Sequence, residues 1–371
     1  MHAAAKDQEC GTGRSVGPES QPAAARQVLS IARATVLEAV QQPIALLLLL
    51  SAVLMTLLVP VFQFHRFSED GRLARDSGLS CMLVFGLVLA AGTAGKLVAE
   101  EIERGTAAAV IGKPVGRVTF VIAKWVGVLG VTVIFWVGVL AALMVAERSS
   151  AHFVTTDEFA GYASDPITLG LAFVGVAAAL TWAAARHGFW RRRFGVTAFM
   201  GVALSQVAVA LLSGFYNRFG QLYPLHGEAA CSGCAAGAGH AHAGQLFYNA
   251  ELNFRVIPVA LLLLFALALF AALATALATR FNGGAALAVC AVVLLLGLAG
   301  DTLLADASLW SWRGVLSGVL PDLQNFWLCD AVAKGGRLPW SYVAAAGAYA
   351  ATGCALFLSA GCWAFEERDL G

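Results

Sequence analysis

The sequence predicts an all-α polytopic membrane protein, and its composition and its long apolar stretches carry this prediction. Charged residues make up 13% of the 371 residues, about half of the roughly 25% that is usual in soluble domains. Hydrophobic residues reach 59%, with a mean hydropathy of +0.75. Several stretches also exceed the ~18 apolar residues that mark a membrane-spanning helix. A soluble enzyme is excluded, because such a chain would leave much apolar surface in water.

The N-terminal part of the chain is expected to lie outside the membrane. Residues 1–25 are polar and rich in Gly, Pro and Ala, without the apolar core of a signal peptide, and we expect a disordered cytoplasmic tail. Residues 26–43 have a basic start and predict an amphipathic helix lying at the membrane interface. One face of this helix carries Val28, Ile31, Thr35 and Ala39. The alternative is a simple extension of the first span.

Residues 44–365 are predicted to form the transmembrane domain, with about eight spans. These lie at 44–64, 79–98, 120–146, 167–185, 194–216, 256–279, 284–304 and 341–365. Lys and Arg favour the cytoplasmic side of a membrane, and they are more numerous in the segments on the side of the N-terminus. The strongest anchor is "RHGFWRRRFG", between the fourth and fifth spans. We therefore expect a chain of the inner cell membrane with both termini, including residues 366–371, in the cytoplasm.

Two segments are expected at the outer surface. The loop 217–255 contains a C-x-x-C and an H-x-H pattern, formed by Cys231, Cys234, His240 and His242. Three interpretations stay open: a flexible Ala/Gly-rich loop, a disulfide in an oxidising compartment, or capture of a soft metal ion. Residues 305–340 are too polar to cross but rich in Trp, which predicts interfacial or re-entrant helices.

The charged bridge 99–119, between the second and third spans, contains the main candidate site. Glu100 and Arg104 are four residues apart, in the favourable order for an ion pair on a helix. The second span is therefore expected to continue as a helix to about Arg104. Gly105 can end this helix and Thr106 can cap a short new one.

The carboxylates of this bridge set it apart from an ordinary positively charged loop. Orientation of a membrane protein requires only Lys and Arg. The acidic residues at the membrane exit, Glu100, Glu101 and Glu103, therefore indicate a separate role. An ordinary cytoplasmic loop remains the alternative.

The stretch "EEIERGTAAAVIGKPVGRVTFVIAK" resembles the segment between the second and third spans of type-2 ATP-binding-cassette (ABC) transporter permeases. The resemblance is strongest to the branch that includes the nitrous-oxide-reductase accessory permease and bacterial sodium and multidrug exporters. The shared pattern is an acidic exit, a Gly-Thr pair, a Pro with an Arg three residues later, and a Lys that opens the next span. The matching residues are Glu101, Glu103, Gly105, Thr106, Pro114, Arg117 and Lys124. The family commonly has six spans, so two here are additional.

This resemblance implies a coupling helix that docks on a separate ABC ATPase subunit. The chain would then be the permease subunit of an ATP-driven exporter. It would pair with a second permease in a homodimer or heterodimer within the lipid membrane, and the partner subunit would bind ATP. The residues implied in coupling are Glu100, Glu101, Glu103, Arg104, Gly105, Thr106, Lys113, Pro114, Arg117 and Lys124. The alternative function is a membrane scaffold or assembly factor that transports nothing.

Few other residues suggest chemistry. Ser205 and Gln206 fall near the middle of the fifth span, where they could line a substrate pathway or bond to a neighbouring helix. The stretch "AGTAGKL" lacks the spacing of a phosphate-binding loop and lies within a span. No catalytic group, resident cofactor or metal site is predicted. The basic residues near 191–193 are explained by topology, so we expect no nucleic-acid partner.

Overall fold

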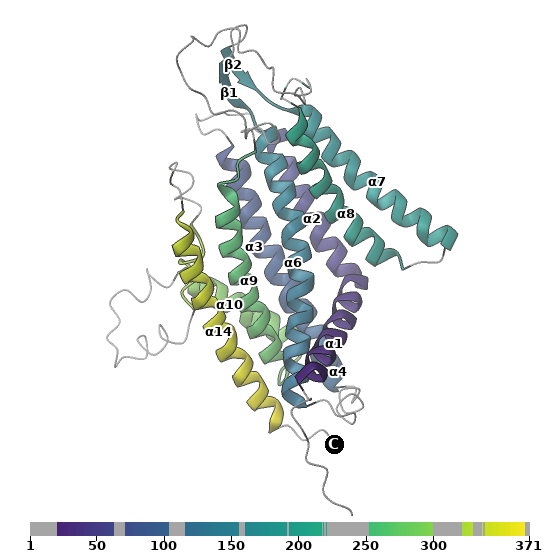
Figure 1. The fold of residues 1–371 in the computed structure, drawn as a ribbon, viewed down its shortest axis with the longest axis vertical. Helices are drawn as coiled ribbons and strands as arrows, with labels where there is room; N and C mark the ends of the chain where they lie inside the picture. Colours follow the sequence, from purple (N-terminus) through teal and green to yellow (C-terminus); the bar gives the residue numbers. More distant parts are fainter. Residues whose placement is uncertain are drawn as a thin grey trace, which may run out of the picture.

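A computed structural model describes residues 21–62, 71–103, 116–155, 160–190, 193–216, 218, 220, 252–299, 321–328, 336 and 338–367. The described helices form an elongated bundle (Figure 1), so the predicted all-α membrane class is confirmed. The first elements are α1 (Gln21–Gln41), α2 (Pro43–Leu58), η1 (Val59–Phe62), α3 (Arg72–Ala94), η2 (Gly95–Ala99), α4 (Glu100–Glu103) and α6 (Arg117–Ser149). They are followed by β1 (His152–Thr155), β2 (Ala160–Ala163), α7 (Pro166–Trp190), α8 (Phe194–Leu212), η3 (Ser213–Phe215), α9 (Val256–Ala278), α10 (Gly283–Leu298) and α14 (Trp340–Glu366).

Seven helical segments in the described part of the chain are long and apolar enough to cross a membrane. They are Pro43–Phe62, Arg72–Ala99, Arg117–Ser149, Pro166–Phe189, Phe194–Phe215, Val256–Ala278 and Trp340–Glu366. The span expected at 284–304 is present as the shorter apolar helix α10, with 16 residues. Such a helix rises only about 24 Å, less than the ~30 Å of a hydrocarbon core.

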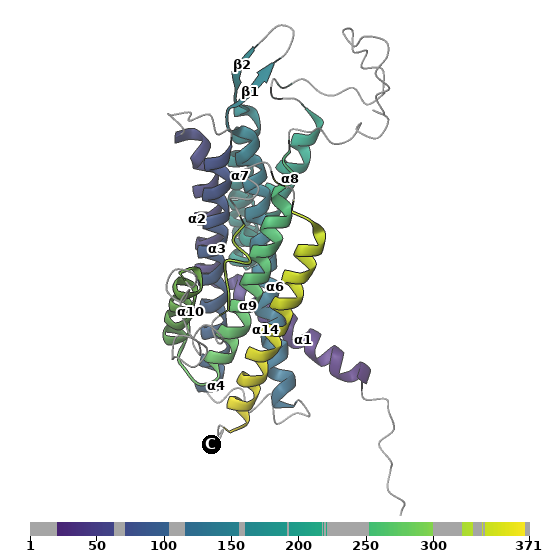
Figure 2. The same cartoon turned by 90° about the vertical axis from the view of Figure 1, so that its left-hand side faces the viewer.

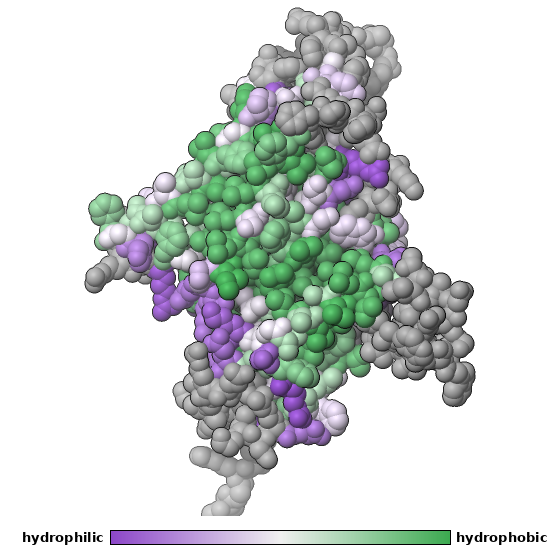
Figure 3. Space-filling model, turned by 180° about the vertical axis from the view of Figure 1, so that it is seen from behind, coloured by the Kyte–Doolittle hydropathy of each residue, from purple (hydrophilic) through white to green (hydrophobic). Residues whose placement is uncertain are grey.

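The two ends of the bundle are used below as landmarks (Figure 1). The lower end contains α4, the start of α6 and the end of α14, and the upper end contains the β1–β2 hairpin. Apolar residues form a broad band across the molecule, and hydrophilic residues gather along both edges of this band (Figure 3). This arrangement is that of a bundle whose middle lies in lipid.

Helix α6 lies at the centre of the bundle and packs against α1, α2, α3, α8 and α9. The core along it includes Phe135, Val139 and Leu143, all fully buried. Helix α14 packs mainly on α9, with a second contact to α6. In Figure 2 the three helices α6, α9 and α14 lie side by side.

Helix α1 packs on the lower half of α6. Thr35 and Ala39, on the apolar face expected from the sequence, are buried. A Cβ at Gly127 of α6 would lie 2.5 Å from the Cβ of Thr35, so the missing side chain allows this close approach. Pro43 is the first residue of α2, a position where the absent N–H of proline costs no helical hydrogen bond.

Two features of the upper end were not expected from the sequence. Strands β1 and β2 form a small antiparallel hairpin, in which His152 pairs with Ala163. Helices α3 and α6 also continue past their predicted apolar stretches, starting at Arg72 and ending at Ser149. They can do so because buried charged side chains pair with one another there, as described below.

Candidate functional site

The lower end of the bundle ties α4 to α6 through an ion pair. Lys124 is 4% exposed, and its Nζ lies 2.5 Å from Oε1 of Glu101. The ammonium also lies over the Phe120 ring, 5.6 Å from its centroid, within the range of a cation–π contact. This pair holds α4 against α6, because a buried ammonium is costly to leave without its counter-ion.

Two arginines bind the last carbonyls of α14 at the same end. Arg117 Nη1 donates to the carbonyl oxygen of Glu366 over 2.7 Å, and Arg280 Nε donates to that of Ala364 over 2.9 Å. Arg280 also pairs with Glu367 (Nη2–Oε2, 3.1 Å). The final carbonyls of a helix have no partner within it and carry partial negative charge. The start of α6 and the turn after α9 are thus both fastened to α14.

A glycine contact joins α3 to α10 next to this cluster. A Cβ at Gly95 would lie 2.4 Å from the Cα of Gly283, so the two backbones touch where α10 begins. Gly95 is also the first residue of η2, a single π-helical turn. Wider turns of this kind occur often at functional sites. Here the turn lies directly before the acidic residues of α4.

The structure brings together part of the predicted coupling set. Glu101 and Lys124 are in contact, Arg117 lies nearby on α6, and Glu100 begins α4. Glu103 is the last residue of α4, and its side chain lies outside the described part of the chain. The same holds for Arg104, Gly105, Thr106, Lys113 and Pro114. The sequence did not point to Arg280 as a partner of this cluster.

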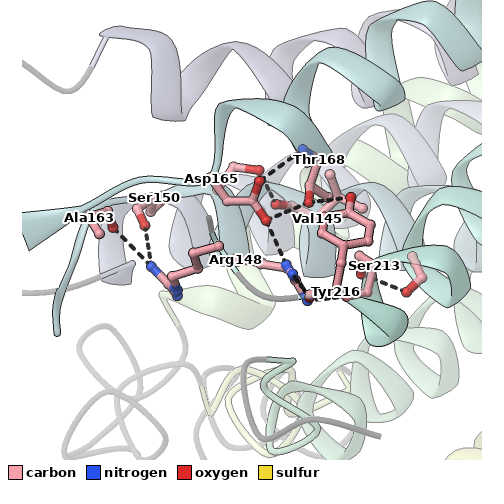
Figure 4. Close-up of polar contacts among 11 residues, drawn as sticks. Val145, Arg148, Ser150, Ala163, Asp165, Thr168, Ser213 and Tyr216 are labelled. Atoms are coloured by element: carbon pink, nitrogen blue, oxygen red, sulfur yellow. Dashed lines mark hydrogen bonds and ion pairs between the residues drawn. The ribbon is translucent and has the colours of Figure 1, made fainter. Parts of the chain in front are cut away.

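At the upper end, Arg148 is the centre of a buried polar network (Figure 4). Its side chain is fully buried, and its Nε donates to Oδ2 of Asp165 over 2.9 Å. Its other nitrogens donate to the carbonyl oxygens of Ser213 and Tyr216. Asp165 in turn accepts hydrogen bonds from the N–H and hydroxyl of Thr168. This network fastens the α7–α8 pair to the end of α6.

The phenol of Tyr216 completes the network. It lies 2.7 Å from the Thr168 hydroxyl, and the Arg148 guanidinium lies 5.1 Å from the centroid of its ring. Burial raises the pKa of the Tyr216 phenol above its ordinary value. The group is therefore neutral and hydrogen-bonding at physiological pH.

A second buried pair joins α3 to α6 one residue earlier. Arg75 Nη1 lies 3.1 Å from Glu147 Oε1, and the amide of Asn253 donates to the same oxygen over 2.8 Å. The consecutive charges Glu147 and Arg148 at the end of a long apolar stretch were the available signal. The third span was expected to end at residue 146, before these two residues, whereas the structure buries both.

Ser205 and Gln206 lie where α8 faces α7. Gln206 is fully buried, and its Nε2 donates to the carbonyl oxygen of Ala172 on α7 over 3.2 Å. The Ser205 hydroxyl donates to the carbonyl oxygen of Val202 in its own helix. In this single chain Gln206 joins two helices, and a pathway role remains a prediction.

The loop with Cys231, Cys234, His240 and His242 lies outside the described residues. Its three interpretations, a flexible loop, a disulfide or a metal site, therefore stay predictions. Among the residues that are described, no three His, Cys, Asp or Glu side chains come together as metal ligands would. Most of the predicted outer segment 305–340 is also outside the described ranges. Of its described part, Leu323 and Phe326 are buried in the bundle core.

A comparison with known protein families gives a match over the first part of the chain. Residues 24–187 match the family described as ABC-2 family transporter protein. This range, under half of the chain, runs from α1 to α7 and includes Glu101 and Lys124. No match was found among curated proteins or among solved structures.

Proposed function

We propose that this multi-pass membrane protein, whose residues 24–187 match the ABC-2 transporter family, is the permease subunit of an ATP-driven exporter. Its spans would move a substrate, while a separate ABC ATPase subunit hydrolyses ATP at the lower end of the bundle. The finer assignment is to the branch of the nitrous-oxide-reductase accessory permease and the sodium and multidrug exporters. A second permease copy would complete the transporter.

The single observation that carries the coupling role is the Glu101–Lys124 ion pair. It lies inside the matched range and joins the segment expected to meet the ATPase to the central helix of the bundle. Its ammonium is buried, whereas the Glu101 side chain is partly exposed. Glu101 would therefore move with the bridge 99–119, and its buried partner Lys124 would transmit that displacement to α6.

The proposed path from the lower to the upper end follows α6. Its 33 residues rise about 50 Å, so this helix reaches from the lower cluster to the upper network. Displacement at Lys124 would reach Arg148 and so the α7–α8 pair. Contacts of α6 with α3 and α9 would carry the same movement across the rest of the bundle.

The proposal places the lower end in the cytoplasm. Arg117 and Arg280 bind the end of α14 at this end, and Arg193, just before α8, donates to Gln41 at the end of α1. Basic residues on one edge favour the cytoplasmic side. The end of α14 also lies there, which agrees with the expected position of the C-terminus.

ATP hydrolysis by the reconstituted complex tests the coupling role. We expect Glu101→Lys, or Lys124→Glu, to remove most of the hydrolysis that the permease stimulates, since each change places like charges about 2.5 Å apart. The double variant, Glu101→Lys with Lys124→Glu, should recover a large part because the attraction is restored in reverse. Circular dichroism and gel filtration check that every variant folds.

Two outcomes would count against this role. One is stimulated hydrolysis in both single variants equal to that of the wild type. The other is loss in the double variant as deep as in the single ones, with all proteins folded. If hydrolysis is coupled but vesicles accumulate no substrate from a panel of ions and drugs, the scaffold alternative gains support.

A further inference from the structure

A long apolar groove runs beside α14, between this helix and its neighbours α6 and α9. Its volume is about 800 Å³, within the range of about 300–1,000 Å³ found for small-molecule pockets. Along α14 it extends from Gly347 to Glu366. That length of helix rises roughly 28 Å, close to the ~30 Å of a hydrocarbon core.

Above its lower mouth, the described walls of this groove are mostly apolar, and the Ser359 hydroxyl and the Trp125 indole already have partners. The Ser359 hydroxyl donates to the carbonyl oxygen of Leu356 in its own helix. The Trp125 indole N–H points to the carbonyl oxygen of Ala268 on α9, 3.5 Å away. Exposed small side chains such as Ala351 and Ala355 line the open side. A hydrocarbon chain fits such walls, because it requires no hydrogen bond.

Exposed tryptophans indicate that lipid covers the open side. Trp363 lines the groove and is 66% exposed, and Trp340, at the other end of α14, is 64% exposed. Indole rings prefer the headgroup layer at both faces of a membrane. Their positions suggest that α14 spans the bilayer in contact with lipid rather than beneath another helix.

The lower mouth of the groove carries one charge of each sign. The Glu366 side chain lines the mouth, and its carboxylate has no partner among the described residues. Arg117 directly precedes Val118, which lines the groove; its Nη1 donates to the backbone carbonyl oxygen of Glu366, and its guanidinium lies 6.0 Å from the centroid of the Phe365 ring. A neutral lipid tail would need neither charge, whereas a zwitterionic headgroup matches both.

We propose that this groove binds a phospholipid whose headgroup carries a phosphate and a primary ammonium. One acyl chain lies along α14, the phosphate lies near Arg117, and the ammonium donates to Glu366. A primary ammonium has three N–H donors, whereas the trimethylammonium of choline has none. The site therefore favours ethanolamine over choline headgroups on otherwise identical lipids.

Native mass spectrometry of the full purified chain tests this site. The protein is titrated with phosphatidylethanolamine or with phosphatidylcholine of the same acyl chains. We expect ethanolamine lipid to bind roughly tenfold more tightly, the effect of about one charge-assisted hydrogen bond. Glu366→Gln should remove this preference while the total amount of bound lipid stays similar.

A pair of phenylalanine variants provides the matched control. Ala351→Phe fills the groove and should abolish retention of the tightly bound lipid. Ala348→Phe adds the same side chain to an exposed position of α14 outside the groove and should bind as the wild type does. Equal lipid binding by Ala351→Phe and Ala348→Phe would overturn the proposal. An unchanged preference for the ethanolamine headgroup in Glu366→Gln would overturn it as well.

Cross-linking identifies the other occupant that could fill the groove. If a second copy of this chain covered it, Ser359→Cys would form disulfide-linked dimers in membranes in high yield, and the lipid site would be refuted. Absence of such dimers, together with lipid loss in Ala351→Phe, supports the proposal. Neither readout depends on ATP hydrolysis, so this site and the coupling role are tested separately.

Discussion

Lys124 and Arg148 lie near opposite ends of α6, and both are cations hidden inside the bundle. Each is satisfied from distant parts of the chain: Lys124 by Glu101, and Arg148 by Asp165 and two backbone carbonyls. An arginine presents its donors in a planar fork that can serve several acceptors at once. This explains why a single residue can hold α6, α7 and the end of α8 together.

Replacing Arg148 should therefore destabilise the protein strongly. Arg148→Ala leaves Asp165 as an uncompensated buried charge, and we expect a loss of about 3–5 kcal/mol in the free energy of unfolding. Arg72→Ala is the control, since the Arg72–Asp76 pair is partly exposed on one helix and contributes only a few tenths of a kcal/mol, about 0.3–0.5. Chemical unfolding in detergent measures both. Similar losses in the two variants would contradict this account of Arg148.

At the scale of elements, α3 and α10 meet through the backbone contact of Gly95 with Gly283. This contact places the start of the short helix α10 against η2, the turn that leads into α4. At its other end, Gly297 of α10 lies under Leu323 of the 321–328 segment, where an added Cβ would be 2.8 Å from that side chain. Helix α10 thus contacts the lower cluster at one end and the 321–328 segment at the other.

Two alanine substitutions in the continuous helical segment Arg72–Ala99 test the importance of this crossing. A Cβ at Gly95 meets backbone, whereas a Cβ at Gly92 meets nothing within 4 Å. We expect Gly95→Ala to cost about 1–3 kcal/mol through overpacking and to reduce stimulated ATP hydrolysis. Gly92→Ala should be neutral or stabilising by up to about 1 kcal/mol, since alanine favours helix. Equal thermal midpoints and activities for both would argue against a tight crossing.

Hydropathy was sufficient to predict most elements, because a lipid-spanning helix must be apolar over its whole length. It underestimated the upper ends of α3 and α6, where Arg75, Glu147 and Arg148 break the apolar pattern. Those charges are tolerated because they pair in the folded bundle, and pairing between distant residues leaves no local signal. The Glu101–Lys124 pair shows the same limit: the sequence predicted that both residues belong to the site, and only the structure gives their contact.

At the scale of the whole molecule, the proposed ATPase subunit contacts the lower end of the bundle and not the upper end. The apolar band separates a lower edge with the fastened ends of α4, α6 and α14 from an upper edge with the Arg148 network and the hairpin. An ATPase subunit can reach only one of these edges in a membrane. Gly116, just before α6, and Arg255, just before α9, are exposed positions at the lower and upper ends.

Site-specific photo-cross-linking between this chain and its ATPase subunit tests the central claim most directly. A photoreactive amino acid is placed at Gly116 in one variant and at Arg255 in the other, in membranes that contain both subunits. The account predicts a cross-linked ATPase from position 116 and none from position 255. Cross-linking from position 255 alone would put the ATPase at the other end and contradict the coupling role of Glu101 and Lys124.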